Sequence, residues 1–157
     1  LAAGGEVIGV IPDLLMRREV GHTGLTRLEI VDDMAIRKTR MIELADGFLT
    51  LPGGFGTLDE LFEVVTLRQL GQHAKPIVLA DPGGYWQPMM AACESMMRAG
   101  LVAERDLSMI EVAASVPEAL AAARAQAKDD DRIVVFGSFL TVAEALRALH
   151  VQDTEAR

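Results

Sequence analysis

The chain has 157 residues, of which half are hydrophobic and only 4% are aromatic. This length is enough for one domain with a buried core. The 15 basic and 23 acidic residues give a net charge of −8. Such a balance argues against a general nucleic-acid-binding protein, because those proteins neutralise phosphates with a basic surface.

Cysteine usage and hydropathy set further expectations. Cys93 is the only cysteine, so no intramolecular disulfide can form, and its Ala/Met-rich surroundings favour a buried, inert thiol. No apolar run reaches membrane-spanning length, and no charged-then-apolar signal segment is present. We therefore expect a cytoplasmic protein with neither a membrane nor a nucleic acid as its partner.

Strand and helix patterns alternate along the chain. In chain order, the pattern predicts a strand at 7–11, a short helix within 13–26, a strand at 28–31, a helix from 32 or 33 to about 45, a strand at 47–51, a helix at about 57–70, a strand at 76–80, a turn at 81–84, a helix at about 87–99, a strand at 110–113, a helix at 117–127, a strand at 132–136 and a helix at 141–150. This alternation predicts an α/β fold with a doubly wound, mostly parallel, Rossmann-like sheet that is incomplete at its N-terminus. Ligand-binding loops are expected at the carboxyl ends of its strands.

The segment 52–60, Pro-Gly-Gly-Phe-Gly-Thr-Leu-Asp-Glu, joins an expected strand to an expected helix. Glycines let backbone N–H groups approach an anion, and the start of a helix adds partial positive charge. Glu60 then places a carboxylate about one helical turn beyond Thr57. A phosphate-binding loop beside an acid indicates chemistry on a nucleotide or sugar phosphate. The alternative is a simple capping box, in which Glu60 bonds back to the Thr57 N–H.

Arg37 lies on the helix expected before the glycine-rich segment. A guanidinium can bind phosphate or ribose hydroxyls in a fixed geometry. The alternative is a solvated helix face shared with Lys38 and Arg40. The three histidines, His22, His73 and His150, lack metal-ligand spacing and are expected to be loop or surface residues.

These motifs stand in the order found in a known family. The segments are 5–12 (Gly-Glu-Val-Ile-Gly-Val-Ile-Pro), 34–41 with Arg37-Lys38, 52–60 and 69–76. The sequence resembles the LONELY GUY (LOG) family, the cytokinin riboside 5′-monophosphate phosphoribohydrolases, over roughly residues 1–125. The resemblance also implies that the chain begins partway through the domain, because a strand, a helix and a second glycine-rich loop precede the matched segment in family members.

The resemblance implies hydrolysis of the N-glycosidic bond of a nucleoside 5′-monophosphate, giving free base and ribose 5-phosphate. It implies Arg37 and Glu60 as catalytic residues. The implied phosphate-binding residues are Gly53, Gly54, Gly56 and Thr57. The resemblance implies no metal or organic cofactor. It implies a homodimer.

The last part of the chain resembles a different family. Residues 131–149 are similar to the carboxyl-terminal end of folylpolyglutamate/dihydrofolate synthases. We therefore expect a LOG-like domain at 1–127 and a linker with a strand–turn–helix tail at 128–157. The tail is expected to pair with an exposed sheet edge. Two alternatives to the hydrolase stay open: a non-catalytic nucleotide-binding or assembly fragment, and a remnant of a folate-polyglutamating ligase.

Overall fold

The computed structural model describes residues 8–16, 25–128 and 130–137. The chain divides into two compact units, residues 1–44 and 45–157, and each is described by itself. Both units combine parallel strands with helices, which confirms the predicted α/β, Rossmann-like class.

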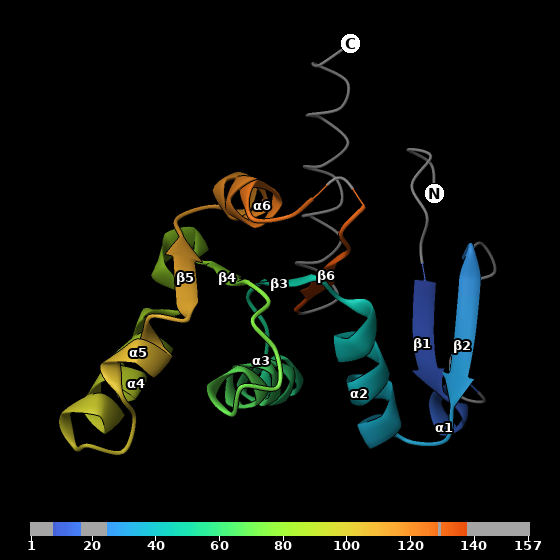
Figure 1. Cartoon of the computed structure of the whole chain (residues 1–157), viewed down its shortest axis with the longest axis horizontal. Helices are drawn as coiled ribbons and strands as arrows, with labels where there is room; N and C mark the ends of the chain where they lie inside the picture. The colour runs from blue at the N-terminus through green and yellow to red at the C-terminus, as the bar shows by residue number, and fades with distance from the viewer. Residues whose placement is uncertain (1–7, 17–24, 129, 138–157) are drawn as a thin grey trace, which may run out of the picture. The chain divides into compact units, whose positions relative to one another are not determined.

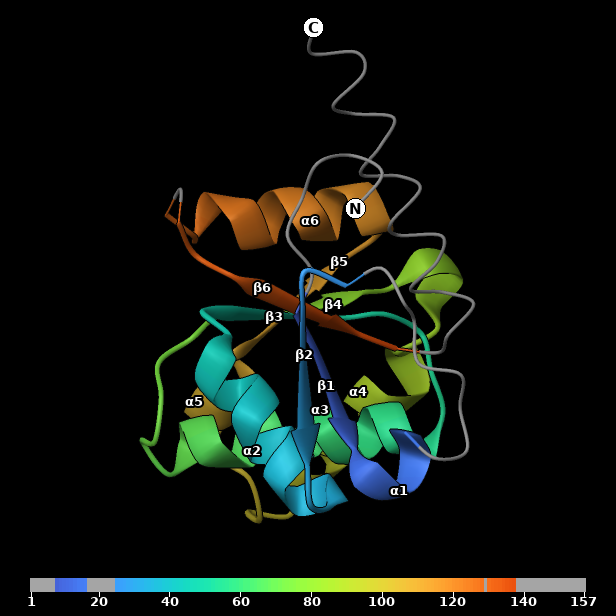
Figure 2. The ribbon, with the colours of Figure 1, turned by 90° about the vertical axis from the view of Figure 1, so that its right-hand side faces the viewer.

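The first unit contains one pair of parallel strands and two helices. Strand β1 (Ile8–Pro12) pairs with β2 (Arg27–Val31) in parallel, as Figure 2 shows. Helix α1 (Asp13–Met16) directly follows β1, and α2 (Met34–Leu44) follows β2. Asp33 caps α2, because its Oδ1 atom accepts a hydrogen bond of 2.8 Å from the Ile36 N–H.

The second unit is built on a four-stranded parallel sheet with the strand order β5-β4-β3-β6. Its strands are β3 (Gly47–Thr50), β4 (Ile77–Ala80), β5 (Ile110–Ala113) and β6 (Ile133–Phe136). Every residue of β3 and β4 is buried. Short, mostly apolar and fully buried runs of this kind are typical of parallel strands that are covered on both faces.

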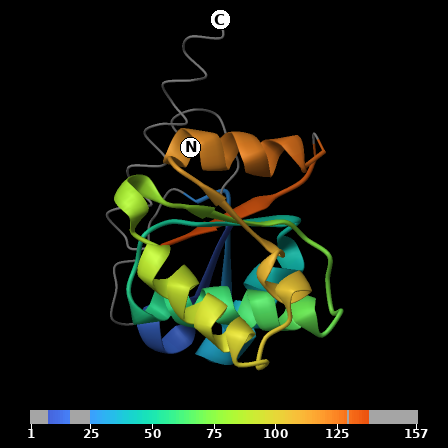
Figure 3. The ribbon, with the colours of Figure 1, turned by 90° about the vertical axis from the view of Figure 1, so that its left-hand side faces the viewer.

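Helices cover both faces of this sheet, so the unit is doubly wound (Figure 1). The helices are α3 (Phe55–Gln69), the short 3₁₀ turn η1 (Pro82–Gly84), α4 (Gln87–Arg98), α5 (Glu104–Leu107) and α6 (Val116–Ala125). Helix α6 lies on one face, and α3 and α4 lie on the other, as Figure 3 also shows. Under α6 the strands and the helix share a core of Leu49, Leu51, Val78, Ala80, Ala119, Leu120 and Ala123.

The four strands do not follow the chain order across the sheet. The chain runs outward from β3 through β4 to β5, and then crosses back to place β6 on the other side of β3. Both edges of β3 are therefore occupied. Among the described residues, β1 and β2 form a separate two-stranded sheet, where the sequence predicted one continuous sheet.

Strand β6 is fixed to β3 by backbone hydrogen bonds at both ends. The Arg132 carbonyl accepts bonds from the Asp46 and Gly47 N–H groups, at 2.7 and 3.2 Å. At the other end, the Leu51 N–H donates to the Phe136 carbonyl at 2.8 Å. The expected pairing of this segment with a sheet edge is confirmed. The helix expected at 141–150 lies outside the described residues.

Three features of the sequence can be checked directly. Cys93 is buried on α4, as predicted, and burial raises the pKa of its thiol, which disfavours the reactive thiolate. Across the described part of the chain, no helix is long and apolar enough to cross a membrane. In the same residues, no group of three or more histidine, cysteine or acidic side chains is placed to hold a metal ion.

His73 connects α3 to the start of β4 and is only partly buried. Its Nε2 atom lies 3.0 Å from the Val64 carbonyl, and its Nδ1 atom accepts a bond of 3.2 Å from the Lys75 N–H. A carbonyl only accepts and an N–H only donates, so the two contacts fit the neutral ring with its hydrogen on Nε2. Burial lowers the pKa of His73, and the charges of Lys75 and Arg68 lower it further, while the bond to Val64 opposes the change.

This environment predicts a dependence of stability on pH. Because the folded pKa lies below the ordinary value of 6.5, the unfolded chain binds a proton more readily than the folded chain. The free energy of unfolding is therefore expected to fall as the pH drops below about 6.5. Urea unfolding at pH 7.5 and 5.5 measures this loss, and it should be smaller in His73→Gln. An equal loss in both proteins would show that His73 does not contribute.

Candidate phosphate-binding loop

The glycine-rich segment begins where β3 ends and forms the start of α3. Gly54 is the N-cap residue, with φ −91° and ψ −153°. The Leu58 N–H donates the first helical bond, 3.1 Å long, to the Gly54 carbonyl. The N–H groups of Phe55, Gly56 and Thr57 precede it, so the helix offers them no carbonyl partner. An oxyanion is a natural acceptor for this set of amides.

The space around this turn is open at two of its glycines. Gly54 and Gly56 are exposed, and a Cβ atom built on either meets nothing within 4 Å. Phe55, between them, is 93% exposed. Gly53 is buried, and Thr57 is only 6% exposed. Gly54 and Gly56 are therefore open to solvent, whereas the Thr57 side chain is buried.

Glu60 lies on α3, one helical turn beyond Gly56, and is half-buried. Side chains in a helix lean toward its N-terminus, so the Glu60 side chain is expected to lie on the side of α3 that faces its first turn. The capping-box alternative is wrong, because the helix begins at Phe55 and Thr57 is already its third residue. The backbone of Gly54, not a side chain, starts the helix two residues earlier than predicted.

Arg37 lies in the other compact unit, on α2, and is half-buried. Its Nε atom donates a hydrogen bond of 3.2 Å to the Val10 carbonyl of β1. The structure thus brings the glycine residues, Thr57 and Glu60 together on one loop and helix, and it places Arg37 in a separate unit. A joint role of Arg37 and Glu60 stays a prediction.

Arg40, three residues further along α2, has a different environment from Arg37. Its Nε and Nη2 atoms bind the two carboxylate oxygens of Glu29 at 2.6 and 3.1 Å, and its Nη1 atom lies 3.1 Å from Glu43. The hydrogen bond from Arg40 lowers the pKa of Glu29, and the same bond raises the pKa of Arg40. This bidentate ion pair links α2 to β2, so Arg40 has a structural role.

A second loop, after β4, lies beside the glycine loop and was missed as part of the site by the sequence analysis. The Tyr85 hydroxyl donates a hydrogen bond of 2.7 Å to the Gly53 carbonyl. Asp81 supports this loop by accepting bonds from the Trp86 N–H and the Gln87 side chain, at 2.6 and 2.8 Å. The turn itself was predicted at 81–84. The carboxyl ends of neighbouring parallel strands share one edge of a sheet, so the order of β3 and β4 is the signal that connects the two loops.

Comparisons with known proteins identify the family of this chain. A family model described as "possible lysine decarboxylase" matches residues 1–123, which include β1, the glycine loop and the loop after β4. The chain belongs to the LOG family. The match ends before β6, and the similarity of residues 131–149 to folate synthases stays a prediction.

Curated relatives carry the phosphoribohydrolase name. A cytokinin riboside 5′-monophosphate phosphoribohydrolase of Rhodococcoides fascians is 42% identical over 125 residues, which cover 79% of this chain and 63% of the relative. A protein of the same name from Mycobacterium tuberculosis is 40% identical over 121 residues, covering 77% of this chain and 65% of the relative. The LOG protein of Oryza sativa is 44% identical over 101 residues, which cover 64% of this chain and 42% of the relative. The chain thus spans less than two thirds of the length of these relatives.

Proposed function

We propose that this LOG-family chain hydrolyses the N-glycosidic bond of a nucleoside 5′-monophosphate. The proposed substrates are AMP or a cytokinin riboside monophosphate, and the products are the free base and ribose 5-phosphate. The names of the relatives support this reaction. The amides at the start of α3 support it independently, because they suit a phosphate group.

One observation carries the proposal: the fold itself does not require glycine at position 56. Gly56 is the second residue of α3, it does not have a positive φ, and the space around its missing Cβ is open. A glycine within a helix costs up to about 1 kcal/mol relative to alanine. Since neither strain nor crowding inside the chain demands glycine here, close approach of a ligand to the backbone is the best reason for it.

In the proposed mechanism, the loop binds the phosphate group of the substrate and Glu60 acts on its ribose. The 5′-phosphate accepts hydrogen bonds from the amides of the loop, and Arg37 holds the phosphate or a ribose hydroxyl. The bond between the base and the anomeric carbon breaks, and water supplies the new oxygen on that carbon and the proton on the base. Positive charge develops on the ribose during this step, so the Glu60 carboxylate stabilises it or activates the water.

The proposal also includes a homodimer in the cytoplasm. The homodimer follows from the family resemblance, and the single buried thiol of Cys93 suits a reducing compartment. Light scattering of the purified chain distinguishes a dimer from a monomer by its mass.

Release of free adenine from AMP tests the reaction itself. Chromatography should detect adenine and ribose 5-phosphate in equal amounts, and adenosine, which lacks the phosphate, should react far more slowly. AMP binding without release of adenine would favour the non-catalytic alternative. If AMP neither binds nor reacts, the proposal is wrong.

Gly56→Ala tests the loop. The added methyl group is expected to weaken AMP binding at least about tenfold, because it fills the space next to the amides, while stability stays equal or rises by up to about 1 kcal/mol. Gly100→Ala is the matched control. Gly100 ends α4 with φ +74°, so alanine there should lower stability by about 1 kcal/mol and leave AMP affinity unchanged. Unchanged AMP affinity in Gly56→Ala would contradict the loop assignment.

A further inference from the structure

One hydroxyl group connects the two neighbouring loops that follow β3 and β4. Tyr85 follows β4 and η1, and its hydroxyl donates a hydrogen bond of 2.7 Å to the Gly53 carbonyl, 32 residues away in the sequence. Strands β3 and β4 are parallel neighbours, so the loops that follow them leave the sheet at the same edge. Nothing in the motif 52–60 itself points to Tyr85.

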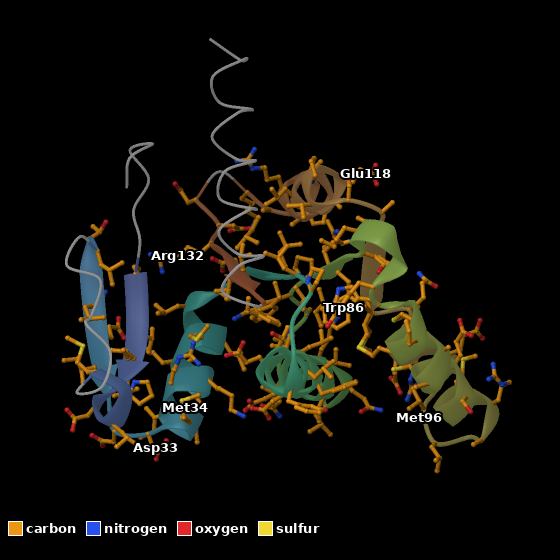
Figure 4. The ribbon with its side chains drawn as sticks, turned by 180° about the vertical axis from the view of Figure 1, so that it is seen from behind. Asp33, Met34, Trp86, Met96, Glu118 and Arg132 are labelled. Atoms are coloured by element: carbon orange, nitrogen blue, oxygen red, sulfur yellow. The ribbon has the colours of Figure 1, made fainter. Side chains whose placement is uncertain are left out.

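The loop that carries Tyr85 is held in place by buried groups. Asp81 is buried, and its two carboxylate oxygens accept bonds from the Trp86 N–H and the Gln87 amide. Trp86 is 2% exposed, lies among packed side chains in Figure 4, and donates from Nε1 to the Ala80 carbonyl at 3.0 Å. The Tyr85 ring packs edge-on against Trp86, with 4.9 Å between the ring centroids. The position of the Tyr85 hydroxyl is therefore set by the core.

Peptide geometry connects this hydroxyl to the anion site. In a trans peptide the carbonyl of one residue and the N–H of the next point in opposite directions. Holding the Gly53 carbonyl toward Tyr85 therefore turns the Gly54 N–H away from Tyr85. Gly54 is exposed at the start of α3, and the space around its missing Cβ is open. Tyr85 itself is 49% exposed.

We infer that Tyr85 is a positioning residue that aims the Gly54 amide at the phosphate group of the ligand. This inference rests on the proposed function. Without the hydroxyl, the Gly53–Gly54 peptide rotates more freely, and the phosphate has to order it on binding. Removal of the hydroxyl therefore weakens binding of the phosphate group and leaves binding of the nucleoside unchanged, so this role can be measured.

Tyr85→Phe removes only the hydroxyl and keeps the packing of the ring. Calorimetry should show AMP affinity reduced about five- to tenfold, the worth of one hydrogen bond, and adenosine affinity unchanged. The ratio of the two affinities is the decisive quantity, because a purely structural role lowers both equally. In NMR spectra, the Gly54 amide signal should move on addition of inorganic phosphate, and move less in the variant.

Ser108→Ala is the matched control. The Ser108 hydroxyl also donates to a backbone carbonyl, that of Arg105, at 2.9 Å, and its removal should leave both affinities unchanged. If the wild-type chain binds AMP and Tyr85→Phe keeps the wild-type ratio of affinities, the inference is overturned and the proposed function stands. If the wild-type chain does not bind AMP, the proposed function fails and the inference fails with it.

Discussion

Glu60→Gln is expected to lower the rate of adenine release from AMP at least about 100-fold, the usual cost of losing one charge-stabilising group in an active site. Glutamine keeps the size of the side chain and its half-buried place on α3, and removes the negative charge. The ribose becomes positively charged only as the glycosidic bond breaks, so the lost charge acts on the transition state. The turnover number should fall while the dissociation constant of AMP changes by less than about threefold.

Asp59→Asn is the control for this experiment. Asp59 is an exposed acid on the same turn of α3, about 100° around the helix from Glu60. Its replacement removes one charge from nearly the same place and should leave most of the activity. Equal losses in the two variants would show that overall charge matters and not the position of Glu60. A normal rate in Glu60→Gln would remove Glu60 from the mechanism.

Phe136→Ala is expected to lower the free energy of unfolding by about 3 kcal/mol or more, as for other buried Phe→Ala changes. Phe136 ends β6, is 6% exposed and packs its ring 6.4 Å from that of Phe48 on β3. Truncation leaves a cavity beside β3 and loosens the strand that occupies its edge. Urea unfolding at constant pH measures the change, and the midpoint should shift with little change in slope.

Phe55→Ala is the matched control for stability. It is the same substitution at a side chain that is 93% exposed, so the free energy of unfolding should change by less than about 0.5 kcal/mol. A loss in Phe136→Ala as small as in Phe55→Ala would mean that β6 contributes little to the fold.

Most secondary structure could be predicted because the local signals agree with the tertiary structure. Buried strands appear as short apolar runs, and Gly71 and Gly100, which end α3 and α4, do have positive φ. Helix α5 was missed because it has only four residues, too few for a periodic pattern. Asp106 in it is nevertheless buried, and binds the Gln69 side chain on α3 across 37 residues of sequence. Contacts of that range leave no local signal.

The residues of the candidate site also differ in whether the sequence could predict them. The glycine loop was predictable because its chemistry lies in consecutive residues. Tyr85 was not, because its role depends on β4 lying next to β3, and strand order is a property of the whole sheet. Arg37 was assigned through family resemblance, and the observed bond to Val10 shows only how it is held on its own unit.

The edge of β3 is occupied by a strand from outside the stretch that the family model matches. Strand β6 is held there by main-chain hydrogen bonds, by the aromatic contact between Phe136 and Phe48, and by the packing of Ile133 and Val135 against the core under α6. A segment of another origin with apolar residues at the places of Ile133, Val135 and Phe136 would meet the same conditions. The candidate phosphate-binding loop would then keep its support while the neighbouring strand is exchanged, which makes this edge a natural point for recombining the domain.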